Sequence, residues 1–321
     1  MFDNTYFPKA KNFWQSGKMY ELSQPTIHSM THALHYGTSV FEGIRAYKTS
    51  RGPAVFRLKE HLDRLFHSAS ILRMTVPYTK EEITEAIKLV VKENKLDSAY
   101  IRPLLFYSYG NLGLLPKACP VELTIGAWEW GAYLGDKVEK GVHACIVPWR
   151  RIHRSQSNMT AKLGGVYVQS AISGMEARSR GFDEALFLNI EGRVAEGPGE
   201  NIAIIKNGVL KTNNNAESIL EGITRSSLLE IAKNSGIETA VGPIEKEEFF
   251  NADEAFFCGT AVEVASIVRV TDASDPNSPE KEYAIGNGEF GAMTKKIKQT
   301  YLEVVTGQVP QYENWLTYVY D

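Results

Sequence analysis

The sequence predicts a protein of the α+β (mixed α/β) class with two domains. One observation is the length of 321 residues, which suggests about two domains. Another is the composition, with 43% hydrophobic and 23% charged residues, which is typical of globular proteins and argues against disorder, collagen or a coiled coil. The third is that segments with helical spacing of apolar residues occur along the same chain as segments rich in aromatic and β-branched residues.

Two helices are predicted in the first part of the chain. Residues 59–72 place leucine, phenylalanine and alanine side chains at helical spacing. Thr79 followed by Glu82 has the spacing of a capping box, in which two side chains satisfy backbone N–H groups at a helix start. A second helix is therefore expected from this point through about Lys95.

Two strands follow these helices. Residues 100–109 and 121–129 are aromatic and β-branched and predict strands. Pro103 has no backbone N–H, so it indicates a bulge in the first strand or a position at a sheet edge. A glycine-rich segment comes next and is the candidate linker. The predicted division is an N-terminal α/β domain over 1–129, an interdomain loop over 130–137 and a C-terminal domain over 138–321.

The second part of the chain also predicts both helices and strands. Asn207-Gly208 between two apolar runs is a strong signal for a β-hairpin. Gly181 and Gly236 are expected to end helices, because glycine readily adopts the left-handed conformation at a helix C-terminus. The predicted strands are 142–148, 184–190, 254–258 and 264–270, and the predicted helices are 165–180, 224–235 and 290–305.

Charge, cysteine count and apolar run lengths restrict the classes of partner. The formal net charge of −3 lacks the basic footprint of a nucleic-acid-binding protein. No stretch approaches the ~20 apolar residues that cross a bilayer, and the N-terminal segment does not resemble a signal peptide. The three cysteines are too few and too widely spaced for a disulfide framework or a four-cysteine zinc site. We therefore expect a cytoplasmic protein without nucleic-acid or membrane partners.

Lys162 is the first candidate for chemistry. It lies in TAKLGGVY, beside a Gly-Gly pair that permits backbones to approach closely. A desolvated lysine has a lowered pKa and can form a Schiff base with a carbonyl. On composition alone, a surface lysine before a helix is the more frequent interpretation.

Glu196 and Glu200 flank a tight loop in VAEGPGEN, residues 194–201. The Gly-Pro-Gly sequence between them forces the turn and holds both carboxylates close to it. On composition alone, an ordinary surface turn is the alternative.

Two further segments can face an anion. In LEGITR, residues 220–225, Gly222 precedes a predicted helix with Thr224 in its first turn. A helix N-terminus presents free N–H groups and the positive end of the dipole, although the threonine can instead act only as a cap. In FCGTAVE, Gly259 and Thr260 end a strand, where backbone N–H groups can face an anion.

Three histidines lie at the start of the segment HALHYGTSVFEGIRAY, residues 32–47, or just before it. His28, His32 and His35 have the spacing that would share one face of a helix, as metal ligands can. However, Gly37 and Gly43, with aromatic and β-branched residues between them, indicate strand and turn instead. We expect the histidines to be packing and hydrogen-bonding groups, with no metal site.

Taken in order, the segments of this chain resemble a known family. HALHYGTSVFEGIRAY at residues 32–47 is followed by EHLDRL, YIRP, WGAYLG, TAKLGG, EGPGEN, EGITR and CGTA. The ordered set closely resembles the branched-chain amino-acid aminotransferases, which are class IV, fold-type IV enzymes that use pyridoxal 5'-phosphate. The resemblance extends over residues 28–265. It implies that cofactor and a two-domain fold-type IV architecture, with an α/β N-terminal domain and a β-barrel-like C-terminal domain.

The resemblance assigns cofactor roles to residues through their motifs. Lys162 matches the Schiff-base lysine, which also shuttles a proton. Glu196 matches the carboxylate that keeps the pyridine nitrogen protonated, so that the ring withdraws electrons. Tyr167 matches the tyrosine that hydrogen-bonds the phenolic oxygen. The residues that match phosphate-binding positions of the family are Arg64, Ile223, Thr224 and Thr260.

The resemblance also implies a substrate site. Tyr100, with the backbone of Thr260 and Ala261, matches the α-carboxylate site, and Arg102 matches the arginine that takes the side-chain carboxylate of glutamate. The apolar walls match Tyr36, Phe41, Trp130 and Tyr133. In the family the tyrosine that Tyr36 matches comes from the neighbouring subunit, which implies at least a homodimer.

The implied reaction is ping-pong transamination between branched-chain L-amino acids (leucine, isoleucine and valine) and 2-oxoglutarate, giving branched-chain 2-oxo acids and L-glutamate. A D-amino-acid or (R)-amine transaminase, or an aminodeoxychorismate lyase, of the same fold is the alternative. Leu163 and Val166 replace smaller or polar residues beside the lysine and leave room for broader amine use. A non-catalytic protein of this fold is a third possibility, but the intact set of cofactor residues argues against it.

Overall fold

The computed structural model of the chain describes residues 7–24, 26–131, 134 and 140–320. The chain forms two compact units. The first unit contains Met1–Gly131, Ala161–Val166 and Glu303–Asp321, and the second contains Ala132–Thr160 and Tyr167–Leu302. The division expected from the sequence has one boundary, at the loop 130–137. The structure differs because Ala161–Val166 and Glu303–Asp321 also belong to the first unit. Most of that loop lies outside the described residues.

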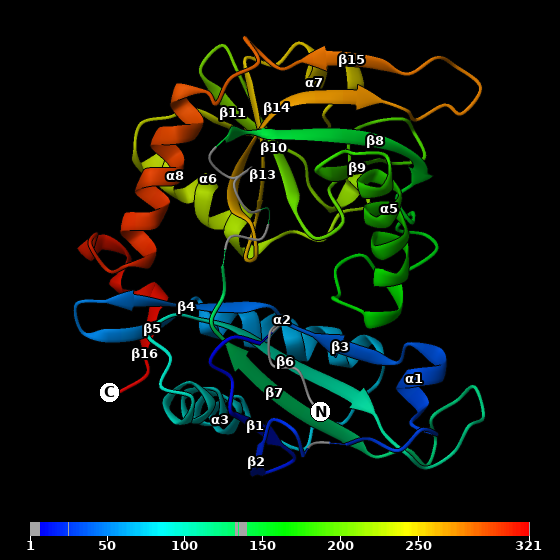
Figure 1. Ribbon diagram of the computed structural model, residues 1–321, viewed down its shortest axis with the longest axis vertical. Helices are drawn as coiled ribbons and strands as arrows, with labels where there is room; N and C mark the ends of the chain where they lie inside the picture. Colours follow the sequence, from blue (N-terminus) through cyan, green and yellow to red (C-terminus); the bar gives the residue numbers. More distant parts are fainter. Residues whose placement is uncertain (1–6, 25, 132–133, 135–139, 321) are drawn as a thin grey trace. The chain divides into compact units, whose positions relative to one another are not determined.

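The first unit is built on an antiparallel sheet (Figure 1). In the described residues it has eight strands in the order β16-β5-β4-β6-β7-β1-β2, with β3 paired to β6. Every strand pair in this sheet is antiparallel. The strands are β1 Asn12–Gln15, β2 Lys18–Glu21, β3 Ser39–Phe41, β4 Ile44–Thr49, β5 Gly52–Phe56, β6 Ala99–Tyr107, β7 Val121–Trp128 and β16 Leu316–Tyr318.

Pro103 corrects one expectation about this sheet. It lies in the central strand β6, and the pairing of β6 with β7 runs from Tyr100 to Tyr107 without a shift in register. The prediction of a bulge or an edge position is therefore wrong. Proline is tolerated because β4 and β3 pair with separate parts of β6 on the other side. Pro103 lies opposite the break between them, where its carbonyl accepts a hydrogen bond from Glu42 N–H at 3.0 Å.

Two helices cover one face of the first sheet, and both were expected from the sequence. Helix α2 is Leu58–Ile71, and α3 is Lys80–Glu93 with the predicted Thr79–Glu82 capping box present. Their leucine, isoleucine and valine side chains form one core with Ile101 and Leu105 of β6. Because side chains alternate along a strand, Tyr100 and Arg102 belong to the opposite face.

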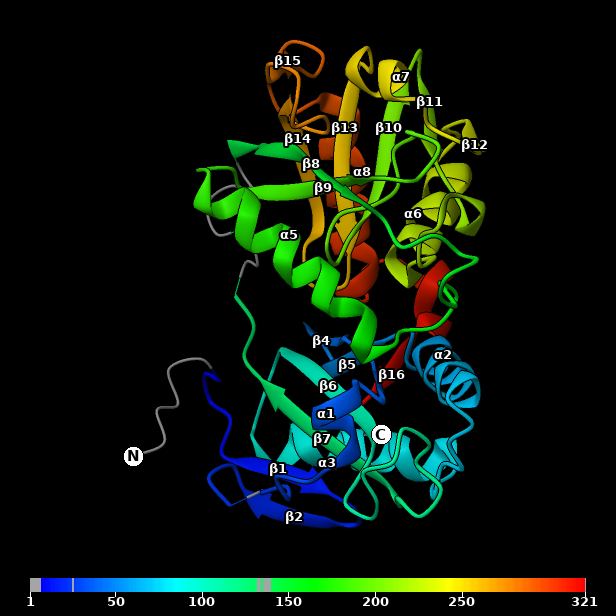
Figure 2. The ribbon, with the colours of Figure 1, turned by 90° about the vertical axis from the view of Figure 1, so that its right-hand side faces the viewer.

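The second unit contains a mixed sheet (Figure 2). Its described strands follow the order β12-β11-β10-β13-β14-β8-β9, with β15 paired to β14. The pairs β8–β9, β8–β14 and β11–β12 are parallel. The predicted hairpin at Asn207-Gly208 is present, and both residues have positive φ, 50° and 80°. The strands are β8 Val142–Arg150, β9 Glu184–Leu188, β10 Asn201–Lys206, β11 Val209–Thr212, β12 Thr239–Val241, β13 Glu254–Gly259, β14 Glu263–Asp272 and β15 Lys281–Ala284.

The segment after β9 links the two ends of this sheet, which makes the second unit barrel-like. The chain turns back so that Phe187 N–H donates to Glu196 O at 2.9 Å. On the other side of the same segment, Val194 N–H donates to Ile244 O at 2.9 Å, beyond the end of β12. The side-chain amide of Asn213, which follows β11, donates to Val194 O at 2.8 Å.

The remaining helices complete the mixed α/β architecture that the sequence predicts. Gly181 and Gly236 follow α5 and α6 with φ of 86° and 75°, as expected for helix-ending glycines. Helix α6 lies beside β13 (Figure 2). No helix in the described part of the chain is long and apolar enough to span a membrane. The helices are α1 His32–Tyr36, α5 Tyr167–Ser179, α6 Ile223–Asn234, α7 Lys246–Phe250, α8 Ala292–Val305 and three 3₁₀ turns, Gly164–Val166, Asn215–Glu217 and Pro310–Trp315.

Candidate functional site

The backbone of Lys162 is held against the first unit. Its N–H donates to Ser68 Oγ on α2 at 2.9 Å, and its carbonyl accepts from the N–H of Phe41 on β3 at 3.3 Å. An antiparallel bridge joins Val40 to Leu163. The lysine segment therefore acts as a short extra strand beside β3, which explains why residues 161–166 belong to this unit.

The Gly-Gly pair beside the lysine allows this close approach. Gly165 N–H donates to Gly37 O at 3.1 Å. A Cβ atom on Gly37 would lie 2.7 Å from the Gly165 Cα, and a Cβ on Gly164 would lie 2.2 Å from Ser39 Oγ. The close backbone approach expected from the sequence is present, and side chains at these positions would push the lysine segment away.

Five residues of the predicted site form one cluster in the first unit. The Lys162 Nζ lies 5.0 Å from the centre of the Phe41 ring, and the Arg102 guanidinium lies 4.7 Å from the same ring. Arg102 Nη2 donates to the Tyr100 hydroxyl at 2.7 Å. Tyr100 in turn stacks on Trp130, with ring centres 4.5 Å apart. Tyr133, predicted for the same wall, lies outside the described residues.

Arg102 lacks a carboxylate partner. Its Nε atom is buried and has no hydrogen-bond partner, and no acidic side chain in the described part of the chain forms a salt bridge with it. Its surroundings are instead a phenol hydroxyl and the rings of Phe41 and Tyr100. A positive charge in this setting is suited to a carboxylate from a ligand.

Tyr36 and the three histidines lie at or near α1. Tyr36 is 44% exposed, and its hydroxyl donates to Leu112 O at 2.9 Å. His32 and His35 lie in α1, so the prediction of strand and turn at these two positions is wrong. As expected, the histidines make hydrogen bonds, including one between His32 and Thr38 at 2.8 Å. Within the described residues, no three His, Cys, Asp or Glu side chains are grouped to hold a metal ion.

Arg64 binds a buried glutamate. Its Nε and Nη2 donate to the two oxygens of Glu42 at 2.7 and 2.8 Å, and His61 Nδ1 donates to the same carboxylate at 2.8 Å. Burial opposes ionisation of Glu42, but Arg64 and His61 outweigh it and hold the pKa of Glu42 well below its usual range. Burial lowers the pKa of His61, and the positive charges of Arg64 and Lys162 act in the same direction. The two hydrogen bonds to Glu42 use two of the five N–H donors of the Arg64 guanidinium.

Glu196 lies in the second unit and is also paired with a buried arginine. Its Oε1 accepts from Arg151 Nε at 2.8 Å, and both side chains are about 95% buried, with exposed fractions of 5% and 4%. Its Oε2 accepts from Asn201 Nδ2 and from Leu220 N–H, each at 3.2 Å. The carboxylate therefore has a fixed orientation and a positive partner.

The start of α6 is open to an anion. Its N-cap residue is Gly222, which has no side chain to cap the helix, and no acidic residue lies in the first turn. Ile223 and Thr224 are the first two residues of the helix, and Thr224 is 2% exposed. The first turn therefore carries no acidic side chain at the positive end of the helix dipole.

Thr260 and Ala261 lie in the turn between β13 and β14, and Tyr167 is the first residue of α5. A Cβ on Gly259 would lie 3.4 Å from Gly199 O, so this turn is close to the loop that follows Glu196. Helix α5 is tied to the same region, because Arg151 Nη1 also contacts Ser170 Oγ at 3.5 Å.

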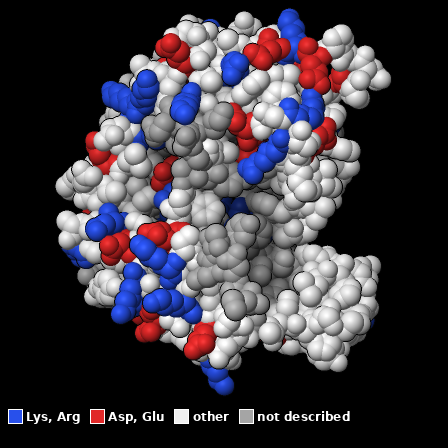
Figure 3. All heavy atoms as spheres, in the orientation of Figure 1, with Lys and Arg blue, Asp and Glu red and all other residues white. Residues whose placement is uncertain are grey.

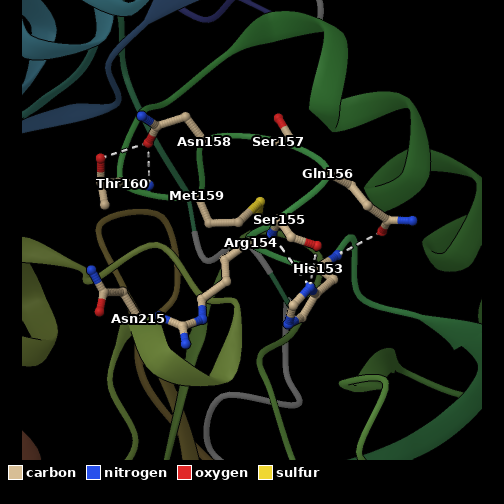
Figure 4. A pocket seen from close by; sticks show the side chains of 9 residues that line it. All are labelled: His153, Arg154, Ser155, Gln156, Ser157, Asn158, Met159, Thr160 and Asn215. Atoms are coloured by element: carbon tan, nitrogen blue, oxygen red, sulfur yellow. Dashed lines mark hydrogen bonds between the residues drawn. The ribbon is translucent and has the colours of Figure 1, made fainter.

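The segment before Lys162 forms a polar pocket of about 650 Å³ in the second unit, lined by residues 153–160 and Asn215 (Figure 4). His153 N–H donates to Gln156 Oε1 at 3.1 Å, and its ring Nδ1 lies 2.7 Å from Ser155 Oγ. No predicted site residue lines this pocket.

Sequence reasoning missed the residues that hold the site residues in place. Glu42, His61 and Ser68 support the first cluster, and Arg151 and Asn201 support Glu196. Asn201 ends the VAEGPGEN motif and Glu42 lies in the 32–47 string, so both were inside segments that the sequence had singled out. Arg151 is one of 35 basic residues and carries no local signal.

Comparison with known proteins agrees with these features. A family model described as amino-transferase class IV matches residues 39–270. A Pseudomonas aeruginosa protein named branched-chain-amino-acid aminotransferase is 42% identical over 307 residues, which cover 95% of this chain and 96% of that protein. The crystal structure of a T.th. branched-chain amino acid aminotransferase complexed with N-(5'-phosphopyridoxyl)-L-glutamate is 44% identical, covers 97% of this chain and 99% of its own, and has a TM-score of 0.89. For an Escherichia coli branched-chain amino acid aminotransferase the identity is 38%, the coverage 97% and 99%, and the TM-score 0.90.

Proposed function

The chain belongs to the class IV aminotransferases, and from this membership we propose that it is a pyridoxal-phosphate-dependent branched-chain-amino-acid transaminase. It exchanges amino groups between leucine, isoleucine or valine and 2-oxoglutarate in a ping-pong reaction. Relatives of about 40% identity over nearly the whole chain carry this name. They favour it over a D-amino-acid or (R)-amine transaminase and over an aminodeoxychorismate lyase.

The residues present fit pyridoxal phosphate. The open start of α6 suits the phosphate, since it offers N–H groups and has no acidic residue in its first turn. The Glu196 carboxylate is buried and oriented, as a partner of the pyridine nitrogen must be. The complex of the T.th. relative with a phosphopyridoxyl glutamate supports the same cofactor.

Each cofactor contact is assigned to a named residue, with Ile223 and Thr224 contributing backbone N–H groups and Thr224 also its hydroxyl. Lys162 holds the cofactor, Glu196 pairs with its ring nitrogen, and Tyr167 binds its phenolic oxygen. Arg64 is assigned to the phosphate because it matches the phosphate-binding arginine of the family, and its two hydrogen bonds to Glu42 hold the guanidinium in place. The phosphate contacts are Arg64, Ile223, Thr224 and Thr260.

The chemistry at the substrate Cα depends on Lys162. Pyridoxal phosphate, when bound, supplies an electron sink for the negative charge that develops at that carbon. The Lys162 amine moves the proton at Cα, which is general acid–base work. Its backbone bonds to Ser68 and Phe41 restrict where the amine can reach.

The observation that carries the substrate assignment is that Arg102, beside the Phe41 ring in the Lys162 cluster, forms no salt bridge with an acidic side chain of the described residues. In our proposal its guanidinium pairs with the γ-carboxylate of glutamate or 2-oxoglutarate, while the aromatic walls accept a branched aliphatic side chain. Tyr100 and the backbone of Thr260 and Ala261 bind the α-carboxylate. The walls are Tyr36, Phe41, Trp130 and Tyr133.

The working unit in this proposal is a cytoplasmic homodimer in which Tyr36 is contributed to the neighbouring subunit. The exposed position of Tyr36 supports this assignment. The three buried free cysteines, Cys119, Cys145 and Cys258, are compatible with a reducing compartment. Lys and Arg are interspersed with Asp and Glu on the face in Figure 3, which agrees with small-molecule partners rather than nucleic acid or a membrane.

A half-reaction tests the proposal. The pyridoxal-phosphate form of the protein is mixed separately with L-leucine, L-glutamate, D-alanine and (R)-1-phenylethylamine, and the visible absorbance of the bound cofactor is followed. We expect bleaching with L-leucine and L-glutamate alone. Bleaching with D-alanine or the (R)-amine instead would show that the family assignment stands and the substrate assignment is wrong.

A further inference from the structure

Asn201 connects two separate parts of the second unit through one side chain. It is the first residue of β10 and is 5% exposed. Its Nδ2 donates to Glu196 Oε2 at 3.2 Å and to Leu220 O at 2.8 Å. Its Oδ1 accepts from Gly222 N–H at 2.8 Å. The same amide group therefore contacts the Glu196 carboxylate and the N-cap residue of α6.

Only an amide side chain of this length supplies both a donor for the Glu196 carboxylate and an acceptor for Gly222 N–H. The carboxamide carries donors and an acceptor on one plane, whereas aspartate lacks the donor and leucine lacks both. The fit at α6 is tight, because a Cβ on Gly222 would lie 2.2 Å from Asn201 Oδ1. The backbone of Asn201 is placed by the sheet, where it pairs with Cys258 of β13.

We propose that Asn201 is a positioning residue that sets the Glu196 carboxylate and the first turn of α6 in a fixed relation to each other. The inference rests on the proposed function, which assigns these two groups to the ring nitrogen and the phosphate of one cofactor. A rigid ligand binds tightly when the protein groups for its two ends are already in place, because neither must be ordered at the moment of binding. Asn201 acts through Glu196 and α6.

Two variants of Asn201 test this role. Asn201→Leu keeps the branched shape in a somewhat larger side chain and removes all three hydrogen bonds, and Asn201→Ala removes them without adding apolar bulk. The first measurement is the dissociation constant of pyridoxal phosphate for the apoprotein. The second is the pH dependence of the visible absorbance of the bound cofactor.

Asn213 offers a matched control. It is also a fully buried asparagine, and its Nδ2 donates to the backbone oxygens of Val194 and Ala195 at 2.8 and 2.7 Å. Its side-chain hydrogen bonds go to these carbonyls, whereas those of Asn201 include the Glu196 carboxylate and Gly222 N–H. Asn213→Leu and Asn213→Ala therefore report the cost of losing a buried amide in the same unit.

We expect both Asn201 variants to bind pyridoxal phosphate about 10- to 100-fold more weakly than the wild type, because buried groups lose their partners. In both variants the acid-side transition of the bound cofactor's visible absorbance moves to higher pH. The reason is that the charged form of Glu196 loses a hydrogen-bond donor that stabilises it. The Asn213 variants keep wild-type affinity and the wild-type pH profile.

Equal losses in the Asn213 variants would overturn the inference and leave Asn201 a merely structural residue. Unchanged affinity and pH profile in both Asn201 variants would overturn it as well. A wild-type protein that does not bind pyridoxal phosphate would overturn the proposed function, and the inference with it, so the two failures are distinguishable.

Discussion

Two arginines of the first unit have opposite surroundings. Arg64 donates two hydrogen bonds to the fully buried Glu42, at 2.7 and 2.8 Å. Arg102 has a phenol hydroxyl and two aromatic rings around it, and its buried Nε has no hydrogen-bond partner. The difference shows that the surroundings of an arginine side chain determine its role. A buried carboxylate fixes the position of the Arg64 guanidinium, whereas no carboxylate of the described residues pairs with Arg102, whose charge is therefore suited to a ligand carboxylate.

Removing the carboxylate beside Arg64 should have the largest effect on stability. We expect Glu42→Ala to lower the free energy of unfolding by about 3–5 kcal/mol, because the Arg64 side chain, which is only 14% exposed, loses its counter-charge. Urea denaturation of the apoprotein measures the loss. The control is Glu129→Ala, which breaks the exposed ion pair with Lys9 and should cost less than about 1 kcal/mol. Similar losses in the two variants would contradict the framework role of Glu42.

Removing the charge of Arg102 should affect selectivity more than stability. We expect Arg102→Leu to lower kcat/KM for glutamate by an amount that corresponds to about 2–5 kcal/mol of lost transition-state stabilisation. The kcat/KM for leucine should fall far less. Steady-state kinetics with each amino acid give the two values. Arg51→Leu, at an exposed arginine paired with Glu313, serves as the control and should change neither. Equal losses for both substrates would show that Arg102 has a general structural role.

The glycine contacts around the Lys162 segment should give a smaller effect. We expect Gly37→Ala to destabilise the protein by about 1–3 kcal/mol, because the new Cβ would lie 2.7 Å from the Gly165 Cα and φ is +66°. Gly199→Ala is the matched control in the second unit, since nothing lies within 4 Å of its Cβ position. Denaturant midpoints compare the two, and equal midpoints would show that the lysine segment tolerates displacement.

The smallest effect should be the pH dependence from His61, beside the Arg64–Glu42 pair. Because burial lowers its pKa in the folded protein, the unfolded chain binds a proton below about pH 6.5 that the folded chain does not. Stability should therefore fall on acidification below this pH, by at most about 1.4 kcal/mol per pH unit from this group. His61→Gln should flatten the slope of unfolding free energy against pH between about 7 and 5. An unchanged slope would mean that other groups dominate this range.

Local patterns predicted much of the fold. The Thr79–Glu82 capping box and the Asn207-Gly208 hairpin occur as expected, because each depends on residues within a few positions of one another. The short strands β1 to β5 and helix α1 were not assigned from the sequence. They span three to six residues each, too few to show a clear period, and pairs such as β1–β7 and β4–β6 join segments far apart in the chain.

By itself, the sequence predicted the chemistry-bearing residues, because Lys162, Glu196 and Arg102 lie in motifs whose resemblance to a known family requires no knowledge of what surrounds them. Only the tertiary structure decided how these groups are held. Glu42 is 22 residues from Arg64, and Arg151 is 45 residues from Glu196. Burial and the pairing of charges over such separations arise when helices and strands pack, so no local pattern can show which arginine is paired with a buried carboxylate of the protein.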